Sequence, residues 1–183
     1  MLQKNLLRKK FYLLRKKKYY NVSKNFFSPF LNLVKLKFKK KKINLALYYP
    51  SLFEINVLKL LDFNYIIKQN LLLPIIKENN SMNFFPWKKN ETLKVNRYGM
   101  LEPIKSKQNI PNIMLVPLIA FDKNKYRLGY GKGFYDRYLN KYLKQFKNIL
   151  TVGVAFSFQK HHKLPINQKD VKLDYIITEK GIY

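Results

Sequence analysis

Apolar runs of strand length, separated by segments with helical spacing, constrain the fold of this chain more than any other feature. Five such runs lie at residues 43–49, 71–76, 112–121, 149–156 and 173–178. They contain few polar residues, which is typical of strands whose two faces are both buried. Because buried strands that alternate with helices form parallel sheets, the sequence predicts an α/β fold with helices on both faces of a sheet.

Helices are predicted from apolar periodicity and from capping signals. Ser28 followed by Pro29 is typical of a helix start, and Phe134, Tyr138, Tyr142 and Phe146 recur at steps of four. The predicted helices cover residues 2–20, 53–69 and 134–147, and a further one begins at Pro29 and ends in the lysine run 39–42. The run 82–87 is predicted as a strand with an edge proline.

The composition narrows the class of protein. With 183 residues, of which 47% are hydrophobic, the chain suits a single domain over 1–183 with a sizeable core. It has no cysteine, so disulfides and thiolate metal sites are excluded, and a reducing compartment such as the cytoplasm fits. No stretch of about 18 uncharged apolar residues occurs, so we expect no transmembrane helix and no membrane partner.

The charge allows two interpretations. A formal net charge of +27 attracts polyanions such as RNA, so a basic RNA-binding or assembly protein stays an alternative. The abundance of Lys, Asn, Ile, Tyr and Phe equally fits a drift towards A/T-rich codons, and no known RNA-binding module is visible. The first acid is Glu54, so the amino-terminal segment can be a transit peptide or an ordinary surface helix.

Half of the six glycines lie in the segment "RLGYGKGFYDRYL", residues 127–139. The segment reads as a glycine-rich loop between a strand and a helix, where backbone N–H groups and the helix dipole favour an anion. Arg127 and Lys132 add positive charge, and Asp136 in the first helical turn either favours the dipole or holds Mg²⁺. The spacing excludes a P-loop and a dinucleotide fingerprint, so from spacing alone phosphate binding and a tight basic turn both remain open.

A longer stretch, "VPLIAFDKNKYRLGYGKGFYDRYL" (116–139), resembles the signature of the 5-formyltetrahydrofolate cyclo-ligases, also called methenyltetrahydrofolate synthetases. The resemblance extends to "MNFFPW" and to residues 96–103, 153–159 and 164–182, and to a Lys-x-x-x-Arg pair, Lys4 and Arg8. It covers most of the chain and is weakest across residues 20–42.

The resemblance implies a fold and a reaction. The fold would be a three-layer α/β/α sandwich with a mostly parallel sheet, akin to sugar-phosphate isomerases and CoA transferases. The reaction would convert 5-formyltetrahydrofolate to 5,10-methenyltetrahydrofolate, with ATP as co-substrate, Mg²⁺ as cofactor, and ADP and phosphate released. The partners would be these small molecules, with no specific nucleic acid, and the protein would be a cytoplasmic monomer. Other readings are a phosphate-sugar or CoA enzyme of the same fold, or a family member that has lost activity.

The resemblance also assigns roles residue by residue. The ATP-binding residues would be Lys4, Arg8, Arg127, Leu128, Gly129, Tyr130, Gly131, Lys132, Gly133, Phe134 and Tyr135. The folate-binding residues would be Tyr49, Glu54, Tyr130, Gly131, Lys132, Gly133 and Phe134. Arg127, Lys132 and Asp136 would be catalytic, and Asp136 and Asp170 would hold the metal.

Several single residues are assigned less directly. Trp87 either stacks on the pterin or packs in the core, Phe121 is expected in the pocket wall, and His161 and His162 are expected at the surface. Three residues depart from the family pattern: Leu118 for glycine, Val57 for threonine and Lys169 for histidine. Leu118 is expected to crowd the substrate, and Val57 to lose a hydrogen bond.

Overall fold

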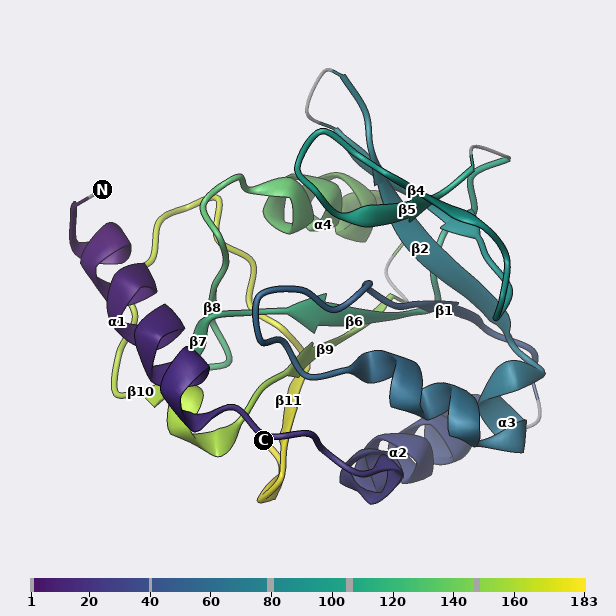
Figure 1. Cartoon of the computed structure of the whole chain (residues 1–183), viewed down its shortest axis with the longest axis horizontal. Helices are drawn as coiled ribbons and strands as arrows, with labels where there is room; N and C mark the ends of the chain where they lie inside the picture. Colours follow the sequence, from purple (N-terminus) through teal and green to yellow (C-terminus); the bar gives the residue numbers. More distant parts are fainter. Residues whose placement is uncertain (1, 40, 79–80, 105–106, 147–148) are drawn as a thin grey trace.

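A seven-stranded sheet forms the centre of the computed structural model, which describes residues 2–39, 41–78, 81–104, 107–146 and 149–183 (Figure 1). Its strand order is β12-β11-β9-β6-β1-β2-β3, and the five inner strands run parallel. The bounds are β1 Asn44–Ala46, β2 Asn70–Ile76, β3 Met82–Pro86, β6 Ile113–Pro117, β9 Leu150–Val154, β11 Tyr175–Thr178 and β12 Gly181–Ile182. The predicted α/β fold with a mostly parallel sheet is confirmed.

Both faces of the sheet are covered, as the unbroken apolar runs predict. Leu45 and Leu47 of the β1 region belong to one buried cluster, and Ala46 between them belongs to the other. Helix α2 (Ser28–Phe38), the 3-10 helix η2 (Val57–Asp62) and the short α3 (Asn64–Ile67) cover the first face, and α4 (Phe134–Gln145) covers the second (Figure 1). The chain therefore folds into helix, sheet and helix layers.

The predicted helix 53–69 is wrong as a continuous element. Phe53 has a φ of +64°, and Phe63 is extended with φ −105° and ψ 120°, so the segment breaks into η2 and α3. Asn56 caps η2 by accepting a hydrogen bond from the Leu58 N–H at 3.0 Å. Apolar residues at steps of three and four suit a 3-10 helix as well as an α-helix, and this ambiguity explains the error.

The predicted run 112–121 also divides, because the chain turns after Pro117. Its second part is β7 (Ala120–Asp122), which pairs with β8 (Arg127–Leu128) and β10 (Lys160–His161) in a separate small sheet. Phe121 lies fully buried within β7 against the second core cluster, so its expected place in the pocket wall is wrong. A hairpin of β4 (Leu93–Val95) and β5 (Leu101–Pro103), which the sequence does not predict, completes the strands.

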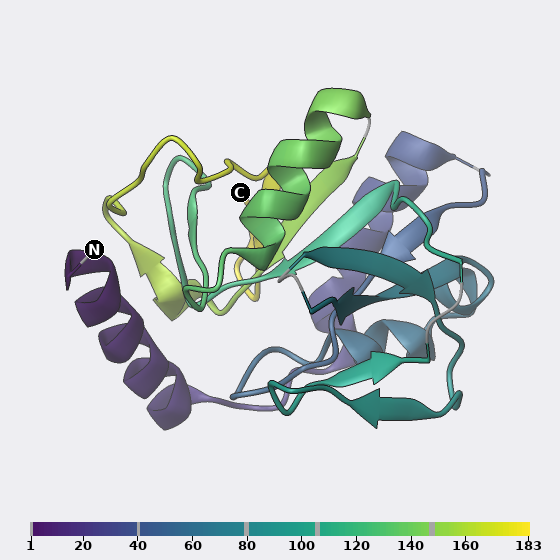
Figure 2. The same ribbon diagram turned by 90° about the horizontal axis from the view of Figure 1, so that it is seen from above.

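Helix α1 (Leu2–Lys18), predicted over residues 2–20, packs on the small sheet. Figures 1 and 2 both show it at one end of the molecule, beside β10. The contact is a third apolar cluster in which Phe11 is buried with residues of β7 and β8. Helix α2 begins at Ser28, with Phe27 before it as the cap, one residue earlier than predicted. Lys40 and residue 147, at the predicted ends of two helices, lie outside the described residues.

Of the remaining expectations for single residues, some are confirmed and others are wrong. Trp87 is 6% exposed and packs in the first core, which confirms the core reading, and β3 with its exposed Pro86 lies at the sheet edge as predicted. His162 is exposed, and His161 is half-buried against the ring of Phe11. Leu118 is 1% exposed in the second core, so its expected crowding of the substrate is wrong.

Gly153 of β9 is a point at which this packing can be tested. A Cβ there would lie 2.5 Å from Ile176 Cδ1 and 2.9 Å from Leu118 Cδ2. We expect Gly153→Ala to lower the free energy of unfolding by about 1–3 kcal/mol, because the core has no room for the methyl group. Urea denaturation measures this loss.

The matched variant is Gly153→Ala combined with Leu118→Val, which shortens one of the two crowding side chains. Its loss should be smaller than the sum of the two single losses, since the residues are in contact. Additive losses, or no loss for Gly153→Ala, would contradict this packing.

Candidate active site

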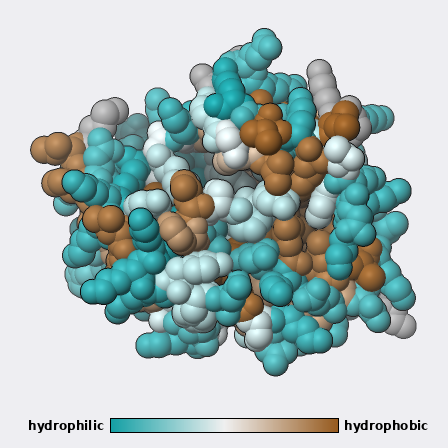
Figure 3. Space-filling view, viewed as in Figure 1, coloured by the Kyte–Doolittle hydropathy of each residue, from teal (hydrophilic) through white to brown (hydrophobic). Residues whose placement is uncertain are grey.

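One cavity of about 1530 Å³ opens at the carboxyl ends of the parallel strands. Its wall is built from α1, the segment after β1, the β4–β5 hairpin, the loop between β8 and α4, and residues 165–170. Figure 3 shows the hollow near the centre of this face. Every residue that the sequence assigned to ATP, folate or metal lies in its wall: Lys4, Arg8, Tyr49, Glu54, Asp170 and all residues from Arg127 to Asp136.

The glycine loop bends in a way that needs glycine at two positions. Gly131 has a φ of +99°, and Gly133, which caps the start of α4, has a φ of +67°. Arg8 of α1 lies against this bend, because a Cβ on Gly131 would be 3.3 Å from Arg8 Cζ. The Nε of Arg8 donates a hydrogen bond to the carbonyl of Gly129 at 2.8 Å. The loop and α1 therefore hold each other in place.

Cationic side chains surround the loop. Arg127 is 8% exposed, its Nη2 forms an ion pair with Asp136 Oδ1 at 2.9 Å, and its Nε is buried without a hydrogen-bond partner. Lys132 is exposed, with its Nζ 5.8 Å from the centre of the Tyr98 ring. The wall carries the basic residues Lys4, Arg8, Arg127, Lys132, Arg137, Lys144 and Lys169 against the acids Glu54, Asp136 and Asp170. This excess of positive charge favours a polyanionic ligand.

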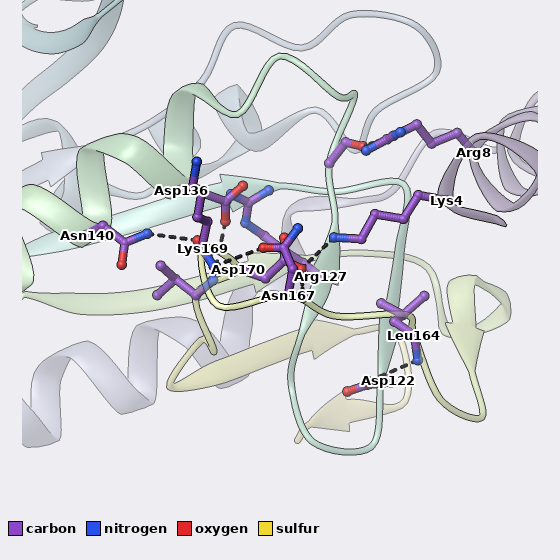
Figure 4. Close-up of polar contacts among 12 residues, drawn as sticks. Lys4, Arg8, Asp122, Arg127, Asp136, Asn140, Leu164, Asn167, Lys169 and Asp170 are labelled. Carbon is purple, nitrogen blue, oxygen red and sulfur yellow. Dashed lines mark hydrogen bonds and ion pairs between the residues drawn. The ribbon is translucent and has the colours of Figure 1, made fainter. Parts of the chain in front are cut away.

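Two carboxylates meet at the same end of the cavity (Figure 4). Asp170 Oδ2 accepts from Lys4 Nζ and from the Asn167 N–H, and Asp136 Oδ1 accepts from the Val171 N–H at 3.4 Å. Among the described residues no group of three or more His, Asp or Glu side chains is arranged around a metal position. Two carboxylates are nevertheless the protein share that Mg²⁺ takes when phosphate oxygens and waters complete its shell.

Glu54 forms a second polar centre in the cavity. It is 7% exposed and accepts from the Ser51 N–H at 2.9 Å and from the Tyr130 hydroxyl at 2.6 Å. Burial raises the pKa of Glu54 above its ordinary value, and burial together with the Glu54 charge raises the pKa of Tyr130. The Tyr130 ring is partly exposed, but its hydroxyl lies inside.

Sequence reasoning missed two parts of this site. Arg15 of α1 is 1% exposed and donates to the Tyr130 hydroxyl at 2.6 Å. Its spacing from Lys4 and Arg8 places all three on one helix face, a signal that the many other basic residues hid. The wall formed by Asn96 and by residues 98–101 of the hairpin was also missed, because the resemblance over residues 96–103 assigned no role to any of them. Of the three departures from the family pattern, Val57 lies in the core and Lys169 in the cavity wall.

Comparison with known proteins places the chain among folate enzymes. The family description "5-formyltetrahydrofolate cyclo-ligase family" matches residues 2–179. A 5-formyltetrahydrofolate cyclo-ligase of Haemophilus influenzae is 33% identical over 81% of this chain and 80% of its own. One of Mycoplasma genitalium is 34% identical over 73% of this chain and 71% of its own.

Solved structures agree. The 5,10-methenyltetrahydrofolate synthetase of Aquifex aeolicus superposes with a TM-score of 0.75 at 32% identity, covering 100% of this chain and 92% of that one. The synthetase of Mycoplasma pneumoniae gives a TM-score of 0.70 at 27% identity, covering 96% and 98%. In the described part of this chain, no helix is long and apolar enough to cross a membrane.

The contribution of Lys4, near the start of α1, to anion binding can be tested with a simple anion. We expect Lys4→Met to weaken the binding of inorganic triphosphate about tenfold, because Lys4 faces the cavity and contributes a charge-assisted contact. Isothermal titration calorimetry measures the affinity. The control is Lys10→Met, which removes the same charge from an exposed position of α1 outside the cavity wall. Equal weakening in both variants would mean that overall charge, not this site, binds the anion.

Proposed function

Because the chain belongs to the 5-formyltetrahydrofolate cyclo-ligase family, we propose that it converts 5-formyltetrahydrofolate to 5,10-methenyltetrahydrofolate at the expense of ATP. The observation that carries the proposal is the convergence of five separate segments on one cavity that holds a glycine loop, clustered cations and a buried glutamate. The same convergence favours the enzyme over a basic RNA-binding or assembly protein.

The reaction needs positioned charge rather than a nucleophilic side chain. The formyl oxygen attacks the γ-phosphorus, the bond to the β-phosphate oxygen breaks, and ADP leaves. N10 then attacks the activated formyl carbon, the carbon–oxygen bond breaks with release of phosphate, and the N10 proton passes to solvent. The first step spreads charge over the transferred phosphoryl group, so cations and backbone N–H groups that face it accelerate the reaction.

In this proposal the two halves of the cavity take different ligands. The loop from Arg127 to Tyr135 binds the triphosphate together with Lys4 and Arg8, and Arg127 and Lys132 neutralise the charge that develops. Asp136 and Asp170 would hold Mg²⁺, which would supply positive charge to the phosphate oxygens. Glu54 accepts paired N–H donors of the pterin, a geometry that suits a carboxylate, and Tyr49 makes a second folate contact.

Three further properties belong to the same proposal. The chain acts as a single cytoplasmic domain over residues 1–183 and as a monomer. Its sandwich resembles those of sugar-phosphate isomerases and CoA transferases. Its partners are small molecules, and the basic surface has no specific nucleic-acid partner.

Lys132 tests the phosphoryl-transfer step. The wild-type protein with ATP, Mg²⁺ and 5-formyltetrahydrofolate should develop the near-ultraviolet absorbance of the methenyl product. Lys132→Ala should lower kcat/KM by about 10²- to 10³-fold, because one stabilising charge is lost from the transition state. Lys141→Ala, an exposed lysine of α4 outside the cavity wall, is the control with the same charge change. Absence of product from folded wild-type protein would refute the function, and equal losses in both variants would refute the role of Lys132.

Variants of Asp136 and Asp170 test whether these two carboxylates bind Mg²⁺. We expect Asp136→Asn and Asp170→Asn each to raise the Mg²⁺ concentration for half-maximal rate about tenfold or more, because each removes one anionic ligand. The measurement is initial rate against Mg²⁺ at saturating ATP. Asp62→Asn, at an exposed position outside the cavity, should leave the curve unchanged. An unchanged Mg²⁺ requirement in both site variants would exclude this metal position.

A further inference from the structure

Arg15 is a buried cation that reaches the nearby Glu54 carboxyl only through the Tyr130 hydroxyl, without a direct ion pair. It is 1% exposed, and no carboxylate of the described residues forms an ion pair with it. Its guanidinium donates to the carbonyls of Leu118 at 3.0 Å and Leu52 at 2.7 Å, and to the Tyr130 hydroxyl at 2.6 Å. Burying a guanidinium without a direct ion pair is unfavourable. The role of these three contacts therefore needs a physical explanation.

The first contact of interest holds a strained segment. Leu52 and Phe53 both have positive φ values, +47° and +64°, which non-glycine residues rarely adopt. Arg15 holds the Leu52 carbonyl, and the rings of Tyr12 in α1 and of Tyr19, just after α1, lie 6.3 and 5.9 Å from the Phe53 ring. The residue that follows this strained pair is Glu54. Strain that is held by surrounding contacts is typical of segments that aim a functional side chain.

The second contact fixes the direction of a hydrogen-bond chain. The Tyr130 oxygen accepts from Arg15, so its single hydrogen is directed to Glu54 Oε1. The Ser51 N–H donates to Oε2 of the same carboxyl. Both oxygens of Glu54 therefore act as acceptors, which is the arrangement of an ionised carboxylate. An ionised carboxylate is also the form that accepts two N–H donors from a pterin.

We propose that Arg15 and Tyr130 are positioning residues for folate: Arg15 fixes the strained Leu52–Phe53 turn and, through the Tyr130 hydroxyl, holds Glu54 ionised and aimed into the cavity. The proposal rests on the proposed function, since it names how that site recognises the pterin. Tyr130 stands at the open position of the Gly-x-Gly pattern, so the hydroxyl belongs to this chain's sequence and not to the glycine geometry. The bridge joins α1, the glycine loop and the pterin side of the cavity.

The pH dependence of folate binding follows from the groups that face Glu54. These groups are Arg15, Ser51, Tyr48, Tyr130 and Tyr135. Burial raises the pKa of Glu54, whereas the Tyr130 hydrogen bond and the Arg15 charge oppose the rise. Folate binding requires the ionised form, so affinity is lost as pH falls through this pKa. Removing either opposing group moves the loss to higher pH.

Two variants test the bridge. Tyr130→Phe removes only a hydroxyl from a residue that is 37% exposed, and Arg15→Gln removes the guanidinium. We expect each to raise the KM for 5-formyltetrahydrofolate about tenfold with little change in kcat or in the KM for ATP, as for a lost hydrogen bond to a charged group. The acid limb of the folate KM profile should move up by about one pH unit. The double variant should lose less folate affinity than the sum of the two single losses, because Arg15 and Tyr130 act in one chain of hydrogen bonds.

Lys16→Gln is the matched control, since it removes the same charge from the adjacent, exposed position of α1. It should leave both KM values and the pH profile unchanged. If Arg15→Gln fails to fold, Tyr130→Phe still decides, because its change is confined to one oxygen atom. A variant that lowers stability alone, with equal effects on both substrates and no movement of the acid limb, would overturn the proposal.

A ligand-free measurement separates this proposal from the function itself. Carbon-13 NMR of the Glu54 carboxyl should show titration at higher pH in Tyr130→Phe than in the wild-type protein. Unchanged titration would overturn the bridge even in a protein with full cyclo-ligase activity. Absence of activity in the wild-type protein together with the expected titration change would refute the function and keep the bridge from Arg15 to Glu54.

Discussion

The packing of α1 on the small sheet is the contact on which the site depends. Phe11 is buried there with Ile119 and Leu128, and each large apolar side chain of this kind contributes about 1.5–3 kcal/mol. The rest of α1 is dominated by lysine, so this narrow stripe and a few hydrogen bonds fix its position. The hydrogen bonds run from Arg8 to the glycine loop and from Arg15 to the turn after β6. The packing of α1 therefore positions the glycine loop and the part of the cavity wall next to Leu52 together with the helix itself.

The proposed function gives a role to the two ion pairs that involve Asp136 and Asp170. Lys4 pairs with Asp170 and Arg127 with Asp136, and the Arg127 side chain is almost fully buried, so loss of one partner would leave an uncompensated charge in the site. A triphosphate with its Mg²⁺ carries both signs of charge. Under the proposed function, the phosphate oxygens would attract the two cations and Mg²⁺ would attract the two carboxylates, so that both ion pairs would exchange together. The ligand-free site would thus keep four charged groups neutralised and close to where the proposed reaction needs them.

Apolar periodicity in the sequence predicted the helices and strands whose buried faces produce it. It failed for segments whose backbone conformation is set by tertiary contacts. The five inner strands were predictable because both faces of each are apolar. The segment 53–69 was not, since the positive φ of Phe53 is held by contacts with Tyr12 of α1 and with Tyr19 that no local pattern records. The hairpin of β4 and β5 escaped because its strands are only three residues long and show no apolar alternation. The glycine loop was predictable because Gly131 and Gly133 serve a backbone need that few other residues can meet.

Arg15 could not be picked out from the sequence because the chain has so many basic residues. The use of arginine rather than lysine at this position is nevertheless informative. The chain has 37 basic residues, and its arginines are Arg8, Arg15, Arg97, Arg127 and Arg137. Four of them donate to backbone carbonyls at or near the cavity, at Gly129, at Leu52 and Leu118, at Lys77 and Glu78, and at Lys132. The fifth, Arg127, pairs with Asp136. A planar guanidinium fixes two or three acceptors at once, whereas an ammonium group is a hydrated point charge. In a chain whose basic residues are otherwise lysine, each arginine therefore marks a place where geometry, not charge, is required, and three of the five, Arg8, Arg127 and Arg137, lie in the cavity wall.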